Sequence, residues 1–130
     1  MVDSGTRVTD ASALAAVAFV ESGAEEVESR LGRAELLAPT LLPVDLANIA
    51  WRKCRRQPSV AEQVASQLDW ALGIQVRLVR VDYREALQLA LLWGLSAYDA
   101  SYLWVAWHAR VPLVTLDRRL AVVAAEMGLS

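Results

Sequence analysis

Four aspartates of this chain stand where a carboxylate has no simple local explanation. Asp10 follows a short candidate strand, and Asp117 ends an apolar run. Asp45 and Asp99 are each the only charged residue in a long apolar stretch. Burying a lone carboxylate is unfavourable unless a cation or hydrogen-bond donors compensate it. Hard oxygen donors of this kind suit Mg²⁺ or Mn²⁺, and two such ions can flank a phosphodiester.

A simpler interpretation exists for each of these residues. Asp10 and Asp117 could cap the helices that they precede, since short polar side chains accept hydrogen bonds from the first free N–H groups. Asp99, three residues after Ser96, could complete a capping box. Asp45 could favour a helix N-terminus electrostatically. One aspartate could lie at this edge of the fold simply because it caps a helix, but chance is a poor explanation for four. The positions of the four residues in the fold therefore decide between the two interpretations.

The elements that must position these residues alternate along the chain. Turn residues separate short strand candidates from helical segments, and all but one of these segments have ten or more residues. We expect strands at 6–9, 35–38, 76–81 and 112–116. We expect helices at 11–21, 25–31, 41–56, 58–72, 83–93, 97–110 and 118–127, with Thr40, Asp82 and Ser96 as caps and Glu85 completing a capping box.

Strands separated by helices predict a parallel sheet that is covered on both faces. Ligands of such sheets bind beyond the carboxyl ends of the strands. Asp10 and Asp117 follow strands directly, and Asp45 and Asp99 lie near the starts of helices at the same edge. The alternation therefore predicts that all four carboxylates meet on one rim, where divalent cations would remove their repulsion.

The chain resembles the PIN-domain ribonucleases, most closely the VapC-type toxins of bacterial toxin–antitoxin pairs. The matching segments are VTDASAL (8–14), APTLLPVDLANIAWR (38–52), LSAYDASYLWVA (95–106) and VTLDRRL (114–120). The resemblance implies a three-layer α/β/α fold with a parallel sheet of four strands, or five if a further edge strand forms. It also implies Mg²⁺- or Mn²⁺-dependent endoribonuclease activity that a cognate antitoxin protein inhibits.

The resemblance assigns roles residue by residue. Asp10, Asp99 and Asp117 match the metal-binding aspartates of the family. Asp45 takes the second acidic position, where the family more often has the longer Glu, and Thr115 matches a small hydroxyl residue two before the last acid. We expect these four aspartates to be the catalytic and metal-binding residues, with Thr115 supporting them.

Polar and basic residues near these positions have two interpretations each. Ser12 and Asn48 are further supporting candidates, and Asn48 shares a helix face with Asp45 and Arg52. Four basic residues fall within five positions: Arg52, Lys53, Arg55 and Arg56. They favour a helix C-terminus and surface charge, but Arg52 and Arg55 could also contact RNA phosphates.

Composition limits what the chain can be. Its length of 130 residues predicts a single domain, which the resemblance identifies as one PIN-like domain over 1–130. The hydrophobic fraction of 55%, together with the resemblance, implies a homodimer. The net charge of −2 provides no global positive field, so RNA binding needs a local patch or bound cations. The lone Cys54 excludes internal disulfides and is consistent with a cytoplasmic location. No stretch is apolar enough for a membrane span.

Other functions fit less well. A phosphoacceptor receiver domain needs a lysine at a late strand end, but the single lysine, Lys53, falls in a predicted helix. A haloacid-type phosphatase needs Asp-x-Asp after its first strand, where this chain has Asp10-Ala11-Ser12. A non-catalytic PIN-like module that binds RNA or protein would be expected to lack one or more of the four acidic residues, whereas this chain has all four. His108 and Cys54 are expected to be structural, and the aromatic residues from Trp93 to Trp107 to form core or a dimer interface.

Overall fold

The centre of the molecule is a parallel sheet of four strands in the order β3-β2-β1-β4. The computed structural model describes residues 5–130, so the first four residues of the predicted domain lie outside it. The strands are β1 (Thr6–Thr9), β2 (Glu35–Pro39), β3 (Val76–Val79) and β4 (Leu113–Val114). The helices are α1 (Ala11–Ala18), α2 (Ala24–Leu31), α3 (Leu42–Arg56), the 3₁₀ helix η1 (Pro58–Val60), α4 (Ala61–Leu72), α5 (Tyr83–Trp93), α6 (Ala97–Ala109) and α7 (Arg118–Glu126).

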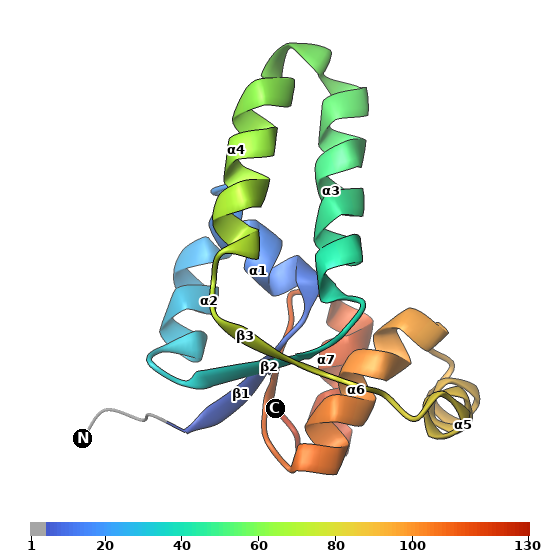
Figure 1. Cartoon of the computed structure of the whole chain (residues 1–130). Coiled ribbons are helices and arrows are strands. Elements are labelled where there is room, and N and C mark those ends of the chain that lie inside the picture. The colour runs from blue at the N-terminus through green and yellow to red at the C-terminus, as the bar shows by residue number, and fades with distance from the viewer. Residues whose placement is uncertain (1–4) are drawn as a thin grey trace.

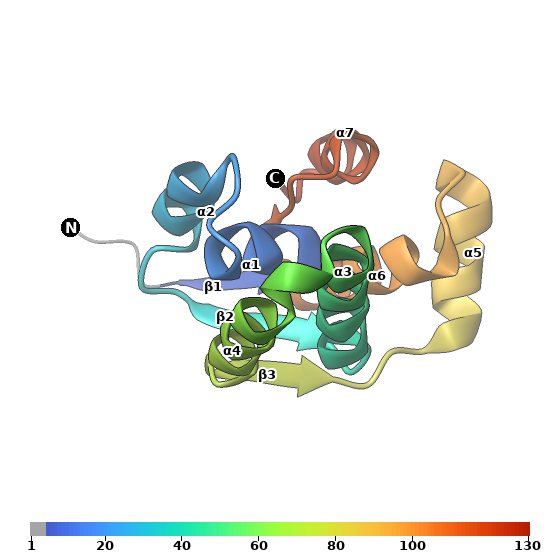
Figure 2. The same cartoon turned by 90° about the horizontal axis from the view of Figure 1, so that it is seen from above.

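Helices cover both faces of the sheet (Figures 1 and 2). The chain runs from β1 to β2 and on to β3 through the pairs α1/α2 and α3/α4, and it returns to the far side of β1 through α5 and α6. Parallel crossovers are right-handed, so this reversal places α6 on the opposite face. There α6 packs on β1, β2 and β4, while α5 and α7 pack on α6. The predicted three-layer α/β/α arrangement is therefore confirmed.

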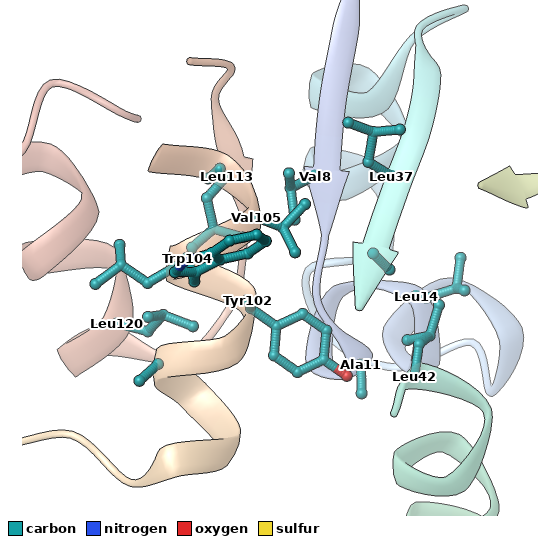
Figure 3. Packing of buried hydrophobic residues seen from close by; sticks show 14 of the residues in the cluster. Val8, Ala11, Leu14, Leu37, Leu42, Tyr102, Trp104, Val105, Leu113 and Leu120 are labelled. Atoms are coloured by element: carbon teal, nitrogen blue, oxygen red, sulfur yellow. The ribbon is translucent and has the colours of Figure 1, made fainter. Parts of the chain in front are cut away.

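The core holds the strand ends in place from both sides. Val8 of β1 is fully buried, with Leu14 of α1 and Val105 of α6 also almost completely inaccessible to solvent. Figure 3 shows Val8 and Leu37 of the sheet among side chains from both helical layers. The alanines of α1 are small enough to bring its backbone close to its neighbours. This packing fixes the carboxyl end of β1, where the first of the four aspartates lies.

Several helix boundaries differ from the prediction, and the helix expected over 58–72 begins as the 3₁₀ helix η1 before α4. The first helix was expected to reach residue 21 but ends at Ala18, because Val20 adopts a left-handed conformation with φ of 53°. Gly23 is the N-cap of α2, with φ of 89°. Thr40 does not cap α3, whose N-cap is Leu41 without a side-chain hydrogen bond.

Two strands are shorter than predicted. The expected strand 112–116 forms ladder pairs only at Leu113–Val114, although the Val8 and Asp10 N–H groups also donate to the Pro112 and Val114 carbonyls. The strand expected to reach residue 81 ends at Val79. No helix within residues 5–130 is long and apolar enough to cross a membrane.

Candidate active site

The carboxyl end of the sheet opens onto a hollow of about 580 Å³. Its walls come from the start of α1, residues 44–52 of α3, the start of α6 and the residue before α7. All four predicted aspartates line it, and Arg52 is the only basic residue among the lining residues in the described part of the chain. The structure thus brings together carboxylates that are more than 100 residues apart in the sequence.

Asp10 is the most buried of the four, with 4% of its surface exposed. Its Oδ1 accepts hydrogen bonds from Ser12 Oγ at 2.8 Å and from the Ala13 N–H at 2.9 Å. Its Oδ2 accepts from Thr115 Oγ1 at 2.5 Å. Burial raises the pKa of Asp10 from 3.8 to about 6, against the lowering effect of these donors. Three donors therefore fix an orientation but do not remove the desolvation penalty of the charge.

Two hydroxyl groups tie Asp10 to the segment after β4. Ser12 Oγ also accepts from the Leu116 N–H at 3.0 Å. Thr115 Oγ1 accepts from the Asp117 N–H at 3.0 Å. Ser12 and Thr115, both predicted as supporting residues, thus set the position of Asp10 relative to Asp117.

Asp45 has a partner that sequence reasoning missed. The Tyr102 hydroxyl, on α6, donates to Asp45 Oδ2 at 2.8 Å. Tyr102 is 2% exposed, and Figure 3 shows its ring pointing from α6 towards α1 and the start of α3. Burial and the neighbouring Asp45 raise the pKa of the phenol above its usual range, so it remains a donor. Burial also raises the pKa of Asp45, while Tyr102 and Arg52 lower it.

The signal for this contact was present but ambiguous. Tyr102 lies three residues after Asp99, which places both on one face of α6. Its aromatic ring was interpreted as core or dimer interface, and the ring is indeed buried. Only the packing of α6 against α3 reveals which carboxylate its hydroxyl reaches.

The helix-capping interpretation is also correct for two of the aspartates. Asp10 caps α1 through the Ala13 N–H, and Asp117 caps α7 through the Leu120 N–H at 2.9 Å. At α6 the cap is Ser96, whose hydroxyl accepts from the Asp99 N–H. Burial raises the pKa of Asp99, and the nearby carboxylates of Asp117 and Asp45 raise it further. Asp10 and Asp117 therefore cap helices and line the hollow at the same time.

The donor set is chemically suited to a divalent cation. Within residues 5–130 the ion pairs are Lys53–Glu21 and Arg77–Glu35, so none of the four carboxylates forms an ion pair there, although the charge of Arg52 lowers the pKa of Asp45. In the same region no three acidic, histidine or cysteine side chains are arranged to enclose one ion. An ion held here would take few protein ligands and complete its shell with water or phosphate oxygens, as Mg²⁺ usually does.

The remaining predicted residues divide between the hollow and its surroundings. Asn48 and Arg52 line the hollow. Arg55 lies outside it, with its guanidinium carbon 5.1 Å from the centroid of the Trp51 ring. Lys53 turns to Glu21, at 2.6 Å. The expected structural role of His108 fits its stacking on Trp104 with ring centroids 4.5 Å apart.

Three comparisons with known proteins agree on what this chain is similar to. The family model described as the PIN domain matches residues 7–126. Ribonuclease VapC3 of Pyrobaculum aerophilum is 33% identical over 119 residues, which cover 88% of this chain and 91% of that protein. The crystal structure of PAE2754 from Pyrobaculum aerophilum is similar with a TM-score of 0.73 and 28% identity, over 92% of this chain and 86% of that one.

Proposed function

The chain belongs to the PIN-domain family, in its VapC ribonuclease branch, and on this premise we propose that it is the toxin of a toxin–antitoxin pair, a Mg²⁺- or Mn²⁺-dependent endoribonuclease. One observation carries the proposal: four carboxylates without a basic ion-pair partner in residues 5–130 line a single hollow. A non-catalytic binding module would not need the whole set. We further propose that residues 1–130 act as one domain, in the cytoplasm where its RNA is found.

The proposed reaction adds water across a P–O bond of RNA. Bound divalent ions would supply positive charge that stabilises the negative charge on the attacking and leaving oxygens. Asp10, Asp45, Asp99 and Asp117 would hold these ions, and the chain's other residues hold the carboxylates. Ser12 and Thr115 fix both oxygens of Asp10, and Tyr102 fixes one oxygen of Asp45. Such fixed positions matter because misplacing a reactant by about 1 Å can reduce a rate by about 100-fold.

Arg52 is the residue best placed to receive the substrate. It is the basic residue that lines the hollow within residues 5–130, and its charge already lowers the pKa of Asp45. A guanidinium binds phosphate through paired donors. We propose that Arg52 and Asn48 contact the RNA backbone beside the scissile bond, with Arg55 further along the strand.

Two protein partners complete the proposal. A homodimer is supported by the outer face of α5, where Tyr83, Leu87 and Leu91 are exposed at intervals of four residues and Leu92 is exposed beside them. Exposed apolar patches of this kind mark protein interfaces. The antitoxin would cover the hollow, where an arginine from its chain could replace the charge of the metal.

Cleavage of an unstructured RNA by the purified protein tests the proposal. We expect cleavage with Mn²⁺ or Mg²⁺, none in EDTA, and none by Asp99→Asn. Asp69→Asn is the matched control, because Asp69 is exposed on α4 and lies outside the hollow. Absence of cleavage by the wild type with either ion, or full cleavage by Asp99→Asn, would show that the proposal is wrong.

A further inference from the structure

The wall of the hollow continues along α3 beyond the four aspartates. In Figure 1, α3 and α4 rise from the sheet as a pair, so this part of α3 projects away from the body of the molecule. Val44, Asn48 and Arg52 line the hollow. Residues three, four and seven apart share a helix face, so Trp51 and Arg55 extend the same face outwards. Arg55 lies about 15 Å along the helix axis from Asp45.

Trp51 is an exposed aromatic residue between two arginines on this face. The indole has Arg55 over its ring at 5.1 Å and still leaves 53% of the residue exposed. A single exposed aromatic residue is ordinary on a protein surface. The arrangement of Trp51 is less ordinary, because it adjoins the hollow and alternates with positive charges.

The charges at the hollow explain why such a face would be needed. The four carboxylates oppose the approach of a polyanion, and the chain as a whole carries −2. Lys53 is committed to Glu21 and lies over the Phe19 ring. Within residues 5–130 neither Arg52 nor Arg55 forms an ion pair, so both guanidinium groups remain available for phosphate.

We infer that Trp51, together with Arg52 and Arg55, is a stacking site for an unpaired base of an RNA strand whose neighbouring phosphate lies in the hollow. The inference rests on the proposed function, since it takes RNA as the molecule that enters the hollow. An aromatic ring between basic side chains is the arrangement that binds single strands with little sequence preference, because every base has a π-face. A base within a duplex keeps both faces stacked on its neighbours, so the site favours unpaired RNA.

Binding of a fluorescent ten-nucleotide single-stranded RNA tests the inference by anisotropy in Mg²⁺. All proteins carry Asp99→Asn so that the RNA stays intact. We expect Trp51→Ala to weaken binding about tenfold, equivalent to about 1.4 kcal/mol. Trp51→Phe should retain most of the affinity because it keeps an aromatic face. Arg55→Gln should reduce the salt dependence by about 0.7 in the log–log slope, the value for one phosphate of a single strand.

Trp70→Ala is the matched control, because Trp70 is 54% exposed on α4 and lies outside the hollow. It should bind RNA like its parent. An oligonucleotide with abasic sugars in place of nucleosides keeps the phosphates, so the effect of Trp51→Ala should vanish with this probe.

The inference is overturned if Trp51→Ala binds RNA as tightly as its Asp99→Asn parent, or if the parent does not bind RNA at all. It is also overturned if Trp70→Ala loses as much RNA affinity as Trp51→Ala, or if the loss in Trp51→Ala persists with the abasic probe. Unchanged RNA affinity with loss of antitoxin binding would identify the face as a protein interface. Binding as expected without cleavage by the wild type would instead refute the proposed function alone.

Discussion

Asp10→Asn should stabilise the metal-free protein at neutral pH, although it removes a residue from the centre of the proposed site. The folded protein holds the Asp10 carboxyl at a pKa of about 6, against 3.8 in the unfolded chain, because the group is buried. Between these two pH values the folded state binds more protons than the unfolded state. The stability of the wild type therefore falls as the pH rises from about 4 to about 6.

The size of the effect follows from the difference between the two pKa values. Each pKa unit corresponds to about 1.4 kcal/mol, so ionisation of Asp10 destabilises the fold by about 3 kcal/mol above pH 6. Asparagine is neutral and has nearly the same shape, and its carbonyl can still accept from the Ala13 N–H. The variant should therefore exceed the wild type by up to about 3 kcal/mol at pH 7.5 and match it near pH 4.

Urea denaturation in EDTA at several pH values between 4 and 7.5 measures this difference. Subtracting the free energy of unfolding of the wild type from that of the variant removes the contribution of Asp45, which both proteins share. The contribution of Asp99 is removed only in part, because its charge also raises the pKa of Asp10. For Asp69→Asn, a substitution at an exposed position, the difference in free energy of unfolding from the wild type should not increase with pH. If Asp10→Asn instead lowers the free energy of unfolding by about 1 kcal/mol at every pH, the reasoning is refuted. A loss that does not depend on pH is the effect expected from removing a helix cap, not from removing a buried charge.

Further outcomes follow from the same geometry. Tyr102→Phe should reduce RNA cleavage about tenfold while changing the free energy of unfolding by about 1 kcal/mol, because Asp45 loses a donor but the ring remains packed; steady-state rates and denaturation curves measure both. Asp45→Asn should reduce cleavage less completely than Asp99→Asn in the same assay, and equal inactivation would contradict a lesser role for the shorter acid. Mn²⁺ at 100 times its Kd should stabilise the wild type by about 2.7 kcal/mol in thermal or chemical unfolding, and Asp10→Asn by clearly less. Leu91→Asp should convert the proposed dimer to monomer in light scattering, and a wild type that is already monomeric would contradict the dimer.

The sequence was sufficient to predict the layers of the fold and the meeting of four carboxylates. Both predictions depend on the periodicity of the apolar residues and on the order of strands and helices along the chain. Strands that alternate with helices form a parallel sheet with one ligand-binding edge. Contacts between distant side chains could not be predicted in this way. Tyr102 reaches Asp45 across 57 residues, and Glu85 accepts from the Trp104 indole at 3.0 Å, a contact made by packing that the predicted capping box did not include.

Short elements were the least predictable part. Val20 ends α1 in a left-handed conformation that a β-branched residue rarely adopts, so no propensity indicates it. The ladder of β4 is limited to two residues because the chain turns at once into the segment where Thr115 bonds Asp10. The site's own hydrogen bonds, which are tertiary, decide where that strand ends.

The bond from Thr115 to Asp10 joins residues 105 positions apart, and it has a consequence for synthesis. A ribosome makes Asp10 more than 100 residues before it makes Thr115 and Asp117. A growing or prematurely terminated chain therefore lacks both the final acid and the hydroxyl that holds the first one. The complete hollow therefore forms only after residues 115–117 have been translated and have left the ribosome. If the chain is the toxin proposed above, its antitoxin has until that moment to be present.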